Sequence, residues 1–435
     1  MRKFLLAGAA TVAMTGVAAA SGLEPTLGSA SSTVTGTAEP GKAIVRLDGY
    51  VFFAVGVATN TNDKAANGAK SDNVGMLSTF RMYPSFDAQT MGGLRYGAFA
   101  EIRSNGNTAG STAVSGTGSG VTGGGNARST NTLNVNRAWG YVGTDGLGRL
   151  QFGQVDGVTS LMRVGTFENI GDGGWNGWAP GMTTGVSPWK FAASGGDLAQ
   201  KLNYSSPVFA GLQLGLSFAP SSTNNQAGYG SSVVTGGAVR QSASVLATDL
   251  ARPRNMYQVA ARYTGSFSGV GVQANVGYFG SSAIQNATVG GASNRGLSIV
   301  SGGATVSYMG FMVGGYMETG SHNGGQTLLA KNVPGSTEKD ALTYVLGASY
   351  STGPWSAGIH YVNSSTAGFA GNNTQRIDSG VSVGLGYVYA PGARVFLEAV
   401  TGTAKENGRN LSNNGAAGTK AIDSTAVIIG NSFRW

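Results

Sequence analysis

Apolar and polar residues alternate with a period of two along most of this chain. In the segment 43–58, apolar side chains such as Val51 and Phe53 fall on one face. Arg46 and Asp48 fall on the opposite face. Because successive side chains of a strand point to opposite faces, this pattern predicts a strand between an apolar medium and water. The segment exceeds the usual strand of ~5–6 residues and suits a strand that crosses a membrane.

Sixteen segments have this texture, and the connections between them alternate between short and long. The expected strands are residues 43–58, 74–84, 93–104, 132–143, 148–154, 200–206, 211–219, 256–267, 270–281, 296–308, 311–320, 341–351, 354–364, 378–389, 393–404 and 422–435. Short connections such as Ser268-Gly269 have the composition of tight turns, whereas long ones such as 155–199 are rich in Gly, Ser, Thr and Asn. We therefore predict an all-β fold, a 16-stranded antiparallel transmembrane β-barrel with short periplasmic turns and long extracellular loops.

Composition agrees with a barrel and argues against catalysis. Charged residues make up 11% of the chain, against roughly 25% in soluble domains. The absence of cysteine excludes a disulfide framework, a Cys-ligated metal site and a thiol nucleophile. The two histidines, His322 and His360, are expected to be lone polar residues, one in a loop and one in a strand. We expect no catalytic residue, no metal and no cofactor, and do not predict an enzyme.

The N-terminal residues predict export. A basic start at Arg2 and Lys3 precedes an apolar stretch, and Ala18-Ala19-Ala20 fits a small-residue cleavage site. These are the three regions of a secretory signal peptide, which we place at residues 1–20. The apolar stretch is too short and too rich in Ala and Gly for a good membrane anchor. The remaining chain divides into an N-terminal polar segment, 21–42, and the barrel, 43–435.

Three motifs resemble the 16-stranded outer-membrane porins of Gram-negative bacteria. Residues 136–143 (NRAWGYVG) and 148–154 (GRLQFGQ) are similar to the strand pair that precedes the constriction loop in that family. Residues 202–212 (LNYSSPVFAGL) are similar to the strand–turn–strand unit that follows the loop. The terminal Phe433 and Trp435 resemble the family's aromatic assembly signal, which usually ends in Phe.

The resemblance implies a pore in the bacterial outer membrane. It implies a homotrimer of barrels, each with a water-filled channel for passive diffusion of small hydrophilic solutes and ions. The third long loop, 155–199, would fold into the barrel and narrow the pore. Expected partners are outer-membrane lipid, lipopolysaccharide and the barrel-insertion machinery, with no role for nucleic acid.

In this family, acidic residues on the inward loop face basic residues on the barrel wall. The acidic candidates on the loop are Glu168, Asp172 and Asp156. The basic candidates on the wall are Arg46, Arg81, Arg95 and Arg103. The excess of wall arginine predicts a weak preference for anions. The alternative for each arginine is that it braces a wall carboxylate such as Asp48 or Glu101. Arg137 is ambiguous, because it shares a face with Trp139 and Tyr141, which suit lipid or an aromatic girdle.

Three other functions stay open. A substrate-specific channel for sugars, phosphate or acidic compounds would have an aromatic ladder or a denser arginine track through the lumen. An outer-membrane enzyme would need a histidine beside a carboxylate or serine. An exported Gly-rich adhesin would have internal repeats and no reason for the terminal aromatic residues.

Overall fold

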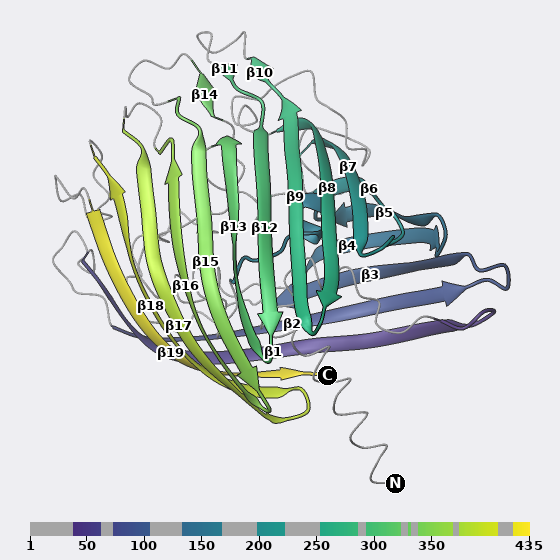
Figure 1. The fold of residues 1–435 in the computed structure, drawn as a ribbon, viewed down its shortest axis with the longest axis horizontal. Coiled ribbons are helices and arrows are strands. Elements are labelled where there is room, and N and C mark those ends of the chain that lie inside the picture. Colours follow the sequence, from purple (N-terminus) through teal and green to yellow (C-terminus); the bar gives the residue numbers. More distant parts are fainter. Residues whose placement is uncertain are drawn as a thin grey trace, which may run out of the picture.

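The computed structural model describes ten stretches of the chain, in which sixteen antiparallel strands close into a barrel (Figure 1). The described residues are 38–61, 73–104, 133–167, 198–221, 253–285, 293–322, 329–331, 338–368, 374–407 and 421–435. The barrel strands are β1 (Ala43–Asn60), β2 (Val74–Gln89), β3 (Arg95–Ser104), β4 (Leu133–Thr144), β5 (Gly148–Val155), β6 (Ala199–Ser205), β7 (Leu212–Ser221), β8 (Arg254–Phe267), β9 (Val270–Ser282), β12 (Ser298–Tyr308), β13 (Phe311–Ser321), β15 (Ala341–Thr352), β16 (Trp355–Thr366), β17 (Arg376–Ala390), β18 (Ala393–Glu406) and β19 (Ala421–Arg434). The predicted fold class is confirmed.

The structure differs from the predicted strands in two respects. The second strand continues through Pro84 to Gln89, where the sequence pattern predicted an end at 84. Proline has no N–H to donate, and the β2–β3 ladder has no partners at Tyr83 and Pro84, yet the same register resumes at Ser85. Three short strands were not predicted: β10 (Ile284–Gln285), β11 (Ser293–Asn294) and β14 (Ala330–Lys331). They form a separate small sheet at the long-loop end of the barrel (Figure 1).

The outer face of the barrel carries the apolar side chains, and aromatic pairs lie toward both ends of the strands. Near the short turns, the ring centroids of Trp355 and Tyr387 are 4.4 Å apart. Toward the long loops, those of Tyr344 and Tyr361 are 6.1 Å apart. Trp355 and Tyr361 lie six residues apart on β16, which is about 20 Å along a strand. Two such belts are typical of a barrel in a lipid bilayer.

Closure of the barrel joins β1 to β19 at the C-terminal residue. The Gly49 amide donates to the Trp435 carbonyl at 3.1 Å, and the Trp435 amide donates to the Gly49 carbonyl at 3.3 Å. The indole of Trp435 covers Gly49 so closely that a Cβ there would lie 1.9 Å from the ring. Phe80 of β2 lies on its other side, with ring centroids 6.4 Å apart. The seam therefore depends on a glycine beneath a large terminal ring.

A segment after β5 leaves the wall and crosses the inside of the barrel. It comprises residues 156–167, contains the one-turn helix α3 (Val158–Leu161), and is called the crossing segment below. Among the described residues, no helix has the length and apolarity needed to cross a membrane. The Val158 amide donates to Ser217 Oγ at 2.8 Å, and the Val164 amide donates to Asn275 Oδ1 at 3.0 Å. Inner-face side chains thus satisfy backbone groups that have no partner in a strand.

Glycines on the inner face of four strands make room for the crossing segment. They are Gly215 of β7 against Val158 and Met162, Gly277 of β9 against Thr159, Gly303 of β12 against the Val164 carbonyl, and Gly347 of β15 against Phe167. A Cβ on Gly303 would lie 2.1 Å from the Val164 carbonyl oxygen, and one on Gly347 would lie 2.4 Å from the Phe167 ring. The first part of the third long loop is therefore inside the barrel, as predicted. Residues 168–197 lie outside the described residues.

One part of the inner face carries large apolar side chains. Tyr50, Phe52, Phe396 and Ile428 are buried on the inner side of β1, β18 and β19. The rings of Phe52 and Phe396 are stacked, with centroids 5.6 Å apart. Phe167, at the end of the crossing segment, belongs to the same apolar cluster. An apolar inner sector therefore holds one end of the segment.

Replacement of Gly303 by alanine is expected to displace the crossing segment, because the added methyl group meets a backbone carbonyl. The neighbouring Gly302→Ala is the matched control, since its Cβ points to the other face and its nearest contact is 3.1 Å away. We expect Gly303→Ala to destabilise the barrel by about 1–3 kcal/mol and to change single-channel conductance, and Gly302→Ala to do neither. The temperature at which the folded barrel loses its characteristic mobility on a gel would measure stability. Planar-bilayer recordings would measure conductance. Equal conductance in the two variants would contradict the crossing geometry.

A double-mutant cycle at the closure seam would test the contact of Gly49 with Trp435. Gly49→Ala is expected to cost about 1–3 kcal/mol with Trp435 present, and close to nothing when Trp435 is also replaced by alanine. The coupling is measured by urea unfolding of barrels refolded into detergent, so that cellular assembly plays no part. Additive effects would show that the two residues do not share the seam.

Candidate functional site

A cluster of charges occupies the inner wall where β2, β3 and β4 meet the crossing segment. Glu101 of β3 is at its centre and accepts from Arg103 Nε and Arg137 Nη1. Arg81 Nη1 lies 3.7 Å from Glu101 Oε1. Asp156, the first residue of the crossing segment, completes this arginine cluster. Among the described residues, the cluster brings three arginines together with two carboxylates.

The contact between Arg137 and Asp156 joins the wall to the crossing segment. Arg137 Nε donates to Asp156 Oδ2 at 2.7 Å, and Nη2 donates to Oδ1 at 3.2 Å. This two-pronged geometry is the strong form of an arginine–carboxylate pair. Both side chains are buried, with 3% and 1% exposed. Loss of either partner would leave the other charged and buried without compensation. The pair therefore fixes where the loop departs from the wall.

A β-bulge in β4 creates the cluster. Glu101 pairs with Arg137, but the next residue of β3, Ile102, pairs with Val135, so Asn136 is an extra residue. The bulge lets two consecutive side chains reach the same carboxylate, because Asn136 Nδ2 also donates to Glu101 Oε2 at 3.1 Å. Simple alternation cannot anticipate this arrangement.

The structure corrects the interpretation of Arg137, Trp139 and Tyr141 as residues that suit lipid or a girdle. All three are buried on the inner face. A signal in the sequence was available, since an arginine on the lipid face near the midplane costs about 2–4 kcal/mol. The charge of Arg137 alone therefore favours placing this face of β4 on the inside of the barrel.

The predicted basic residues do not form one group. Arg81 and Arg103 lie opposite each other in the β2–β3 register and share Glu101. Arg95 is eight residues from Arg103 on β3, about 26 Å along the strand. It pairs with Asp145 at 3.2 Å, at the short-turn end.

Arg46 also lies apart from the cluster. It is on the inner face of β1, opposite Ser85 of β2. Of the predicted acidic residues, Asp156 joins the arginine cluster, whereas Glu168 and Asp172 lie outside the described residues.

A carboxylate that the sequence analysis did not select lies on the opposite wall. Glu318 belongs to β13, which is eight places from β3 in a ring of sixteen strands. Its side chain is fully buried and accepts from the Tyr316 hydroxyl at 3.4 Å. Arg163 of the crossing segment lies over the Tyr316 ring, 5.9 Å from its centroid. A strand thus contributes a carboxylate to the far wall, whereas the sequence analysis had considered only acidic residues of the loop.

The aromatic residues beside the cluster form a packed row. Phe99 lies between Tyr83, with ring centroids 6.1 Å apart, and Trp139, with centroids 5.3 Å apart. Tyr141 extends the row beyond Trp139 at 6.2 Å. Because Tyr83, Trp139 and Tyr141 are buried, the row supports the wall and offers no open surface to a passing solute.

Neither histidine offers a catalytic arrangement in the described residues. His322 and His360 are buried, and neither ring has a hydrogen-bond partner there. Burial lowers the pKa of His322 to about 4, so its imidazole is neutral at pH 7. No group of three His, Asp or Glu side chains in the described part of the chain is arranged to hold a metal ion.

Comparison with solved structures shows the same architecture in other outer-membrane proteins. An anion-selective porin from Comamonas acidovorans matches 91% of this chain and 100% of its own, with a TM-score of 0.54 and 14% identity. OmpT, an outer membrane protein of Vibrio cholerae, matches 92% of this chain and 100% of its own, with a TM-score of 0.52 and 14% identity. A mutant of the Rh. blastica porin matches 90% and 100%, with a TM-score of 0.51 and 14% identity. At this identity the likeness concerns the fold alone.

The family assignment comes from the sequence itself. No curated protein sequence matches the chain. A family model described as Gram-negative porin matches residues 7–409, which is most of the chain. With its closed sixteen-stranded barrel and inward crossing segment, the chain belongs to the Gram-negative porins, channel proteins of the bacterial outer membrane.

Proposed function

We propose that each barrel holds a water-filled pore for passive diffusion of small hydrophilic solutes and ions, with a weak preference for anions. The observation that carries the anion preference is the arginine cluster, in which Arg81, Arg103 and Arg137 surround Glu101 and Asp156. The cluster lies beside the crossing segment, and its Arg103 side chain is 24% exposed there. Charges behind low-dielectric walls act over a longer range than charges on an open surface.

The charge acts across the pore. Glu318 is a buried carboxylate on β13, the strand opposite β3 in the ring, and a field between these two walls is part of the proposal. Such a transverse field orders water and ranks solutes by charge. Arg103, whose side chain is 24% exposed, is the most accessible of the three arginines and meets solutes directly. Arg81 and Arg137 are buried and contribute through their field.

A substrate-specific channel for acidic compounds is the second candidate. The buried aromatic row gives no support to a sugar ladder. Acidic solutes are favoured by a second group of arginines at the short-turn end, formed by Arg95, Arg149 and Arg262. A diffusion pore lets anions pass without binding them, whereas a substrate-specific channel also binds them.

Replacement of Arg103 by glutamine tests the anion preference. The expected result is a fall of about twofold in the chloride-to-potassium permeability ratio, because the accessible positive charge is lost. Arg376→Gln is the matched control, since Arg376 pairs with Asp378 on β17 at 2.9 Å, away from the cluster. Reversal potentials in a KCl gradient across a planar bilayer measure the ratio. A cation-selective wild-type channel would overturn the proposed preference, and equal effects of the two variants would remove Arg103 from the constriction.

The assembled form is proposed to be a homotrimer that lacks residues 1–20. The outward apolar face would contact lipid and lipopolysaccharide, and Phe433 with Trp435 would be read by the insertion machinery. Edman sequencing of protein from outer membranes should begin at Ser21, and unheated protein should migrate at three times the mass of the heated barrel. A mature protein that keeps Met1, or a monomer in mild detergent, would contradict these expectations.

A further inference from the structure

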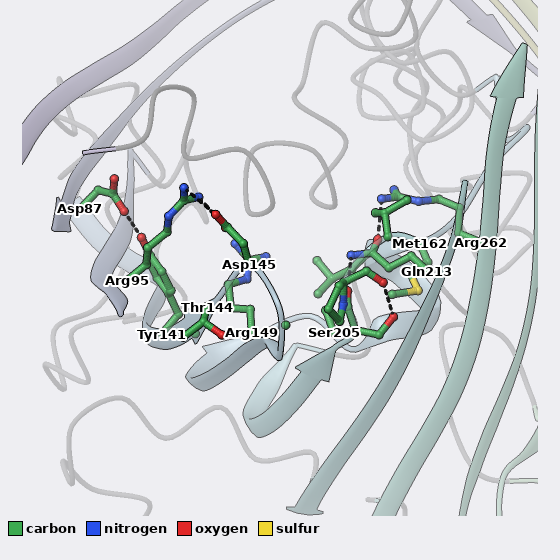
Figure 2. Close-up of a pocket in the computed structure, with 16 residues that line it drawn as sticks. Asp87, Arg95, Tyr141, Thr144, Asp145, Arg149, Met162, Ser205, Gln213 and Arg262 are labelled. Atoms are coloured by element: carbon green, nitrogen blue, oxygen red, sulfur yellow. Dashed lines mark hydrogen bonds and ion pairs between the residues drawn. The ribbon is translucent and has the colours of Figure 1, made fainter. Parts of the chain in front are cut away.

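A cavity of about 470 Å³ lies below the crossing segment at the short-turn end of the inner wall. Figure 2 shows its lining residues, which come from two sides. Arg95, Tyr141 and Arg149 lie on one side, and Gln213 and Arg262 on the other (Figure 2). The cavity is in the size range of sites for small ligands, about 300–1,000 Å³. It is separate from the arginine cluster, because Arg95 and Arg103 are at opposite ends of β3.

Two of the three arginines in this cavity have no carboxylate partner in the described part of the chain. Arg95 is paired with Asp145 at 3.2 Å. Arg149 lies over the Tyr141 ring, 5.6 Å from its centroid, and Arg262 Nη2 donates to the neutral Gln213 Oε1 at 2.9 Å. These two guanidinium groups line the same cavity, and neither forms an ion pair with a described carboxylate.

The other carboxylate of the lining is already occupied. Asp87 accepts from the Ala38 amide at 2.8 Å through one oxygen and from the Tyr141 hydroxyl through the other. Asp87 forms no ion pair with Arg149 or Arg262, although its negative charge still counts in the lining. Three arginines against Asp87 and Asp145 leave the cavity with one excess positive charge, which favours an anionic occupant.

The rest of the lining combines polar residues such as Thr144, Ser205 and Ser206 with an apolar part. Leu161 and Met162 of the crossing segment form one part, and Pro207 and Val208 of the β6–β7 turn form another. Inorganic anions gain nothing from such surfaces, whereas an organic anion can lay its hydrocarbon part there. A guanidinium fork binds a carboxylate through two parallel hydrogen bonds. The combined chemistry is that of a small organic carboxylate.

We propose that this cavity is a binding site for small organic carboxylates, held between Arg149 and Arg262 with the hydrocarbon part against Leu161, Met162 and Val208. The proposal extends the proposed function and rests on it, since the ligand arrives through the lumen. Together with the arginine cluster, the cavity would give an anion two successive binding sites along the pore. A pore with several weak sites conducts well, because binding at each site is strong enough for an ion to enter and weak enough for it to leave.

The test uses benzoate as the probe and the full-length, membrane-inserted protein. Benzoate added at the short-turn side of a planar bilayer in KCl should reduce chloride current in a saturable manner. In Arg149→Gln/Arg262→Gln, the half-saturating concentration should rise about tenfold or more, because charge-assisted hydrogen bonds are lost. The matched control is Arg394→Gln, an inner-face arginine of β18 that lies outside the cavity lining. Equal saturation curves for the double variant and wild type would overturn the proposal.

A second measurement separates this site from the diffusion pore. Equilibrium dialysis of radiolabelled benzoate against the detergent-purified barrel reads binding without any conduction. Saturable binding that is lost in the double variant supports the site, whatever the selectivity of the channel. A channel without anion preference in KCl would overturn the proposed selectivity alone. Anion preference without saturable binding would overturn the site alone.

The ligand class is tested at Val208, which is 63% exposed and belongs to a turn, so its replacement leaves the barrel strands intact. Val208→Asn should weaken benzoate binding severalfold and leave inorganic phosphate unchanged. If inorganic phosphate displaces benzoate from the wild-type protein at a concentration below that of benzoate, the site prefers an inorganic anion and the carboxylate assignment is overturned.

Discussion

The absence of hydrogen-bonding partners in lipid is the constraint on which this structure depends. Every amide and carbonyl of a strand in the membrane must be paired by another strand, so the sheet has to close. Here the ring closes through the ladder of eleven residue pairs between β1 and β19, and Trp435 continues this ladder by exchanging both backbone hydrogen bonds with Gly49. Once the ring is closed, alternation along each strand separates an outer face for lipid from an inner face for solutes, and every later feature lies on one or the other.

The inner face combines two requirements that oppose each other. Charges must be held in place to act on solutes, yet the lumen must also admit a segment of backbone. Glycines at positions such as Gly277 and Gly303 meet the second requirement by removing side chains where the crossing segment lies. The buried pair of Arg137 with Asp156 meets the first and also anchors the segment at its start. The start of the crossing segment and the charges beside it are thus both held by β4.

The strands were predictable from the sequence because their signals are local. Period-two alternation and turn residues such as Ser268-Gly269, with φ of 50° and 82°, do not depend on distant parts of the chain. The site was less accessible. The bulge at Asn136 breaks the parity on which side-chain assignments rest, and the role of Glu318 requires knowing which strand faces β3. The second strand was predicted to span 74–84, whereas its ladders with β1 and β3 continue beyond Pro84.

The contacts of the crossing segment have a consequence for how permeability can evolve. At Gly303 and Gly165 the segment touches the wall through main-chain atoms, including the carbonyls of Val164 and Gly315. Main-chain atoms have no rotamers to exchange, so the free width of the passage is inherited from the circumference of the barrel. Substitutions of lumen side chains then retune which solutes pass by charge and chemistry, while the mechanical calibre of the channel stays tied to the number of its strands.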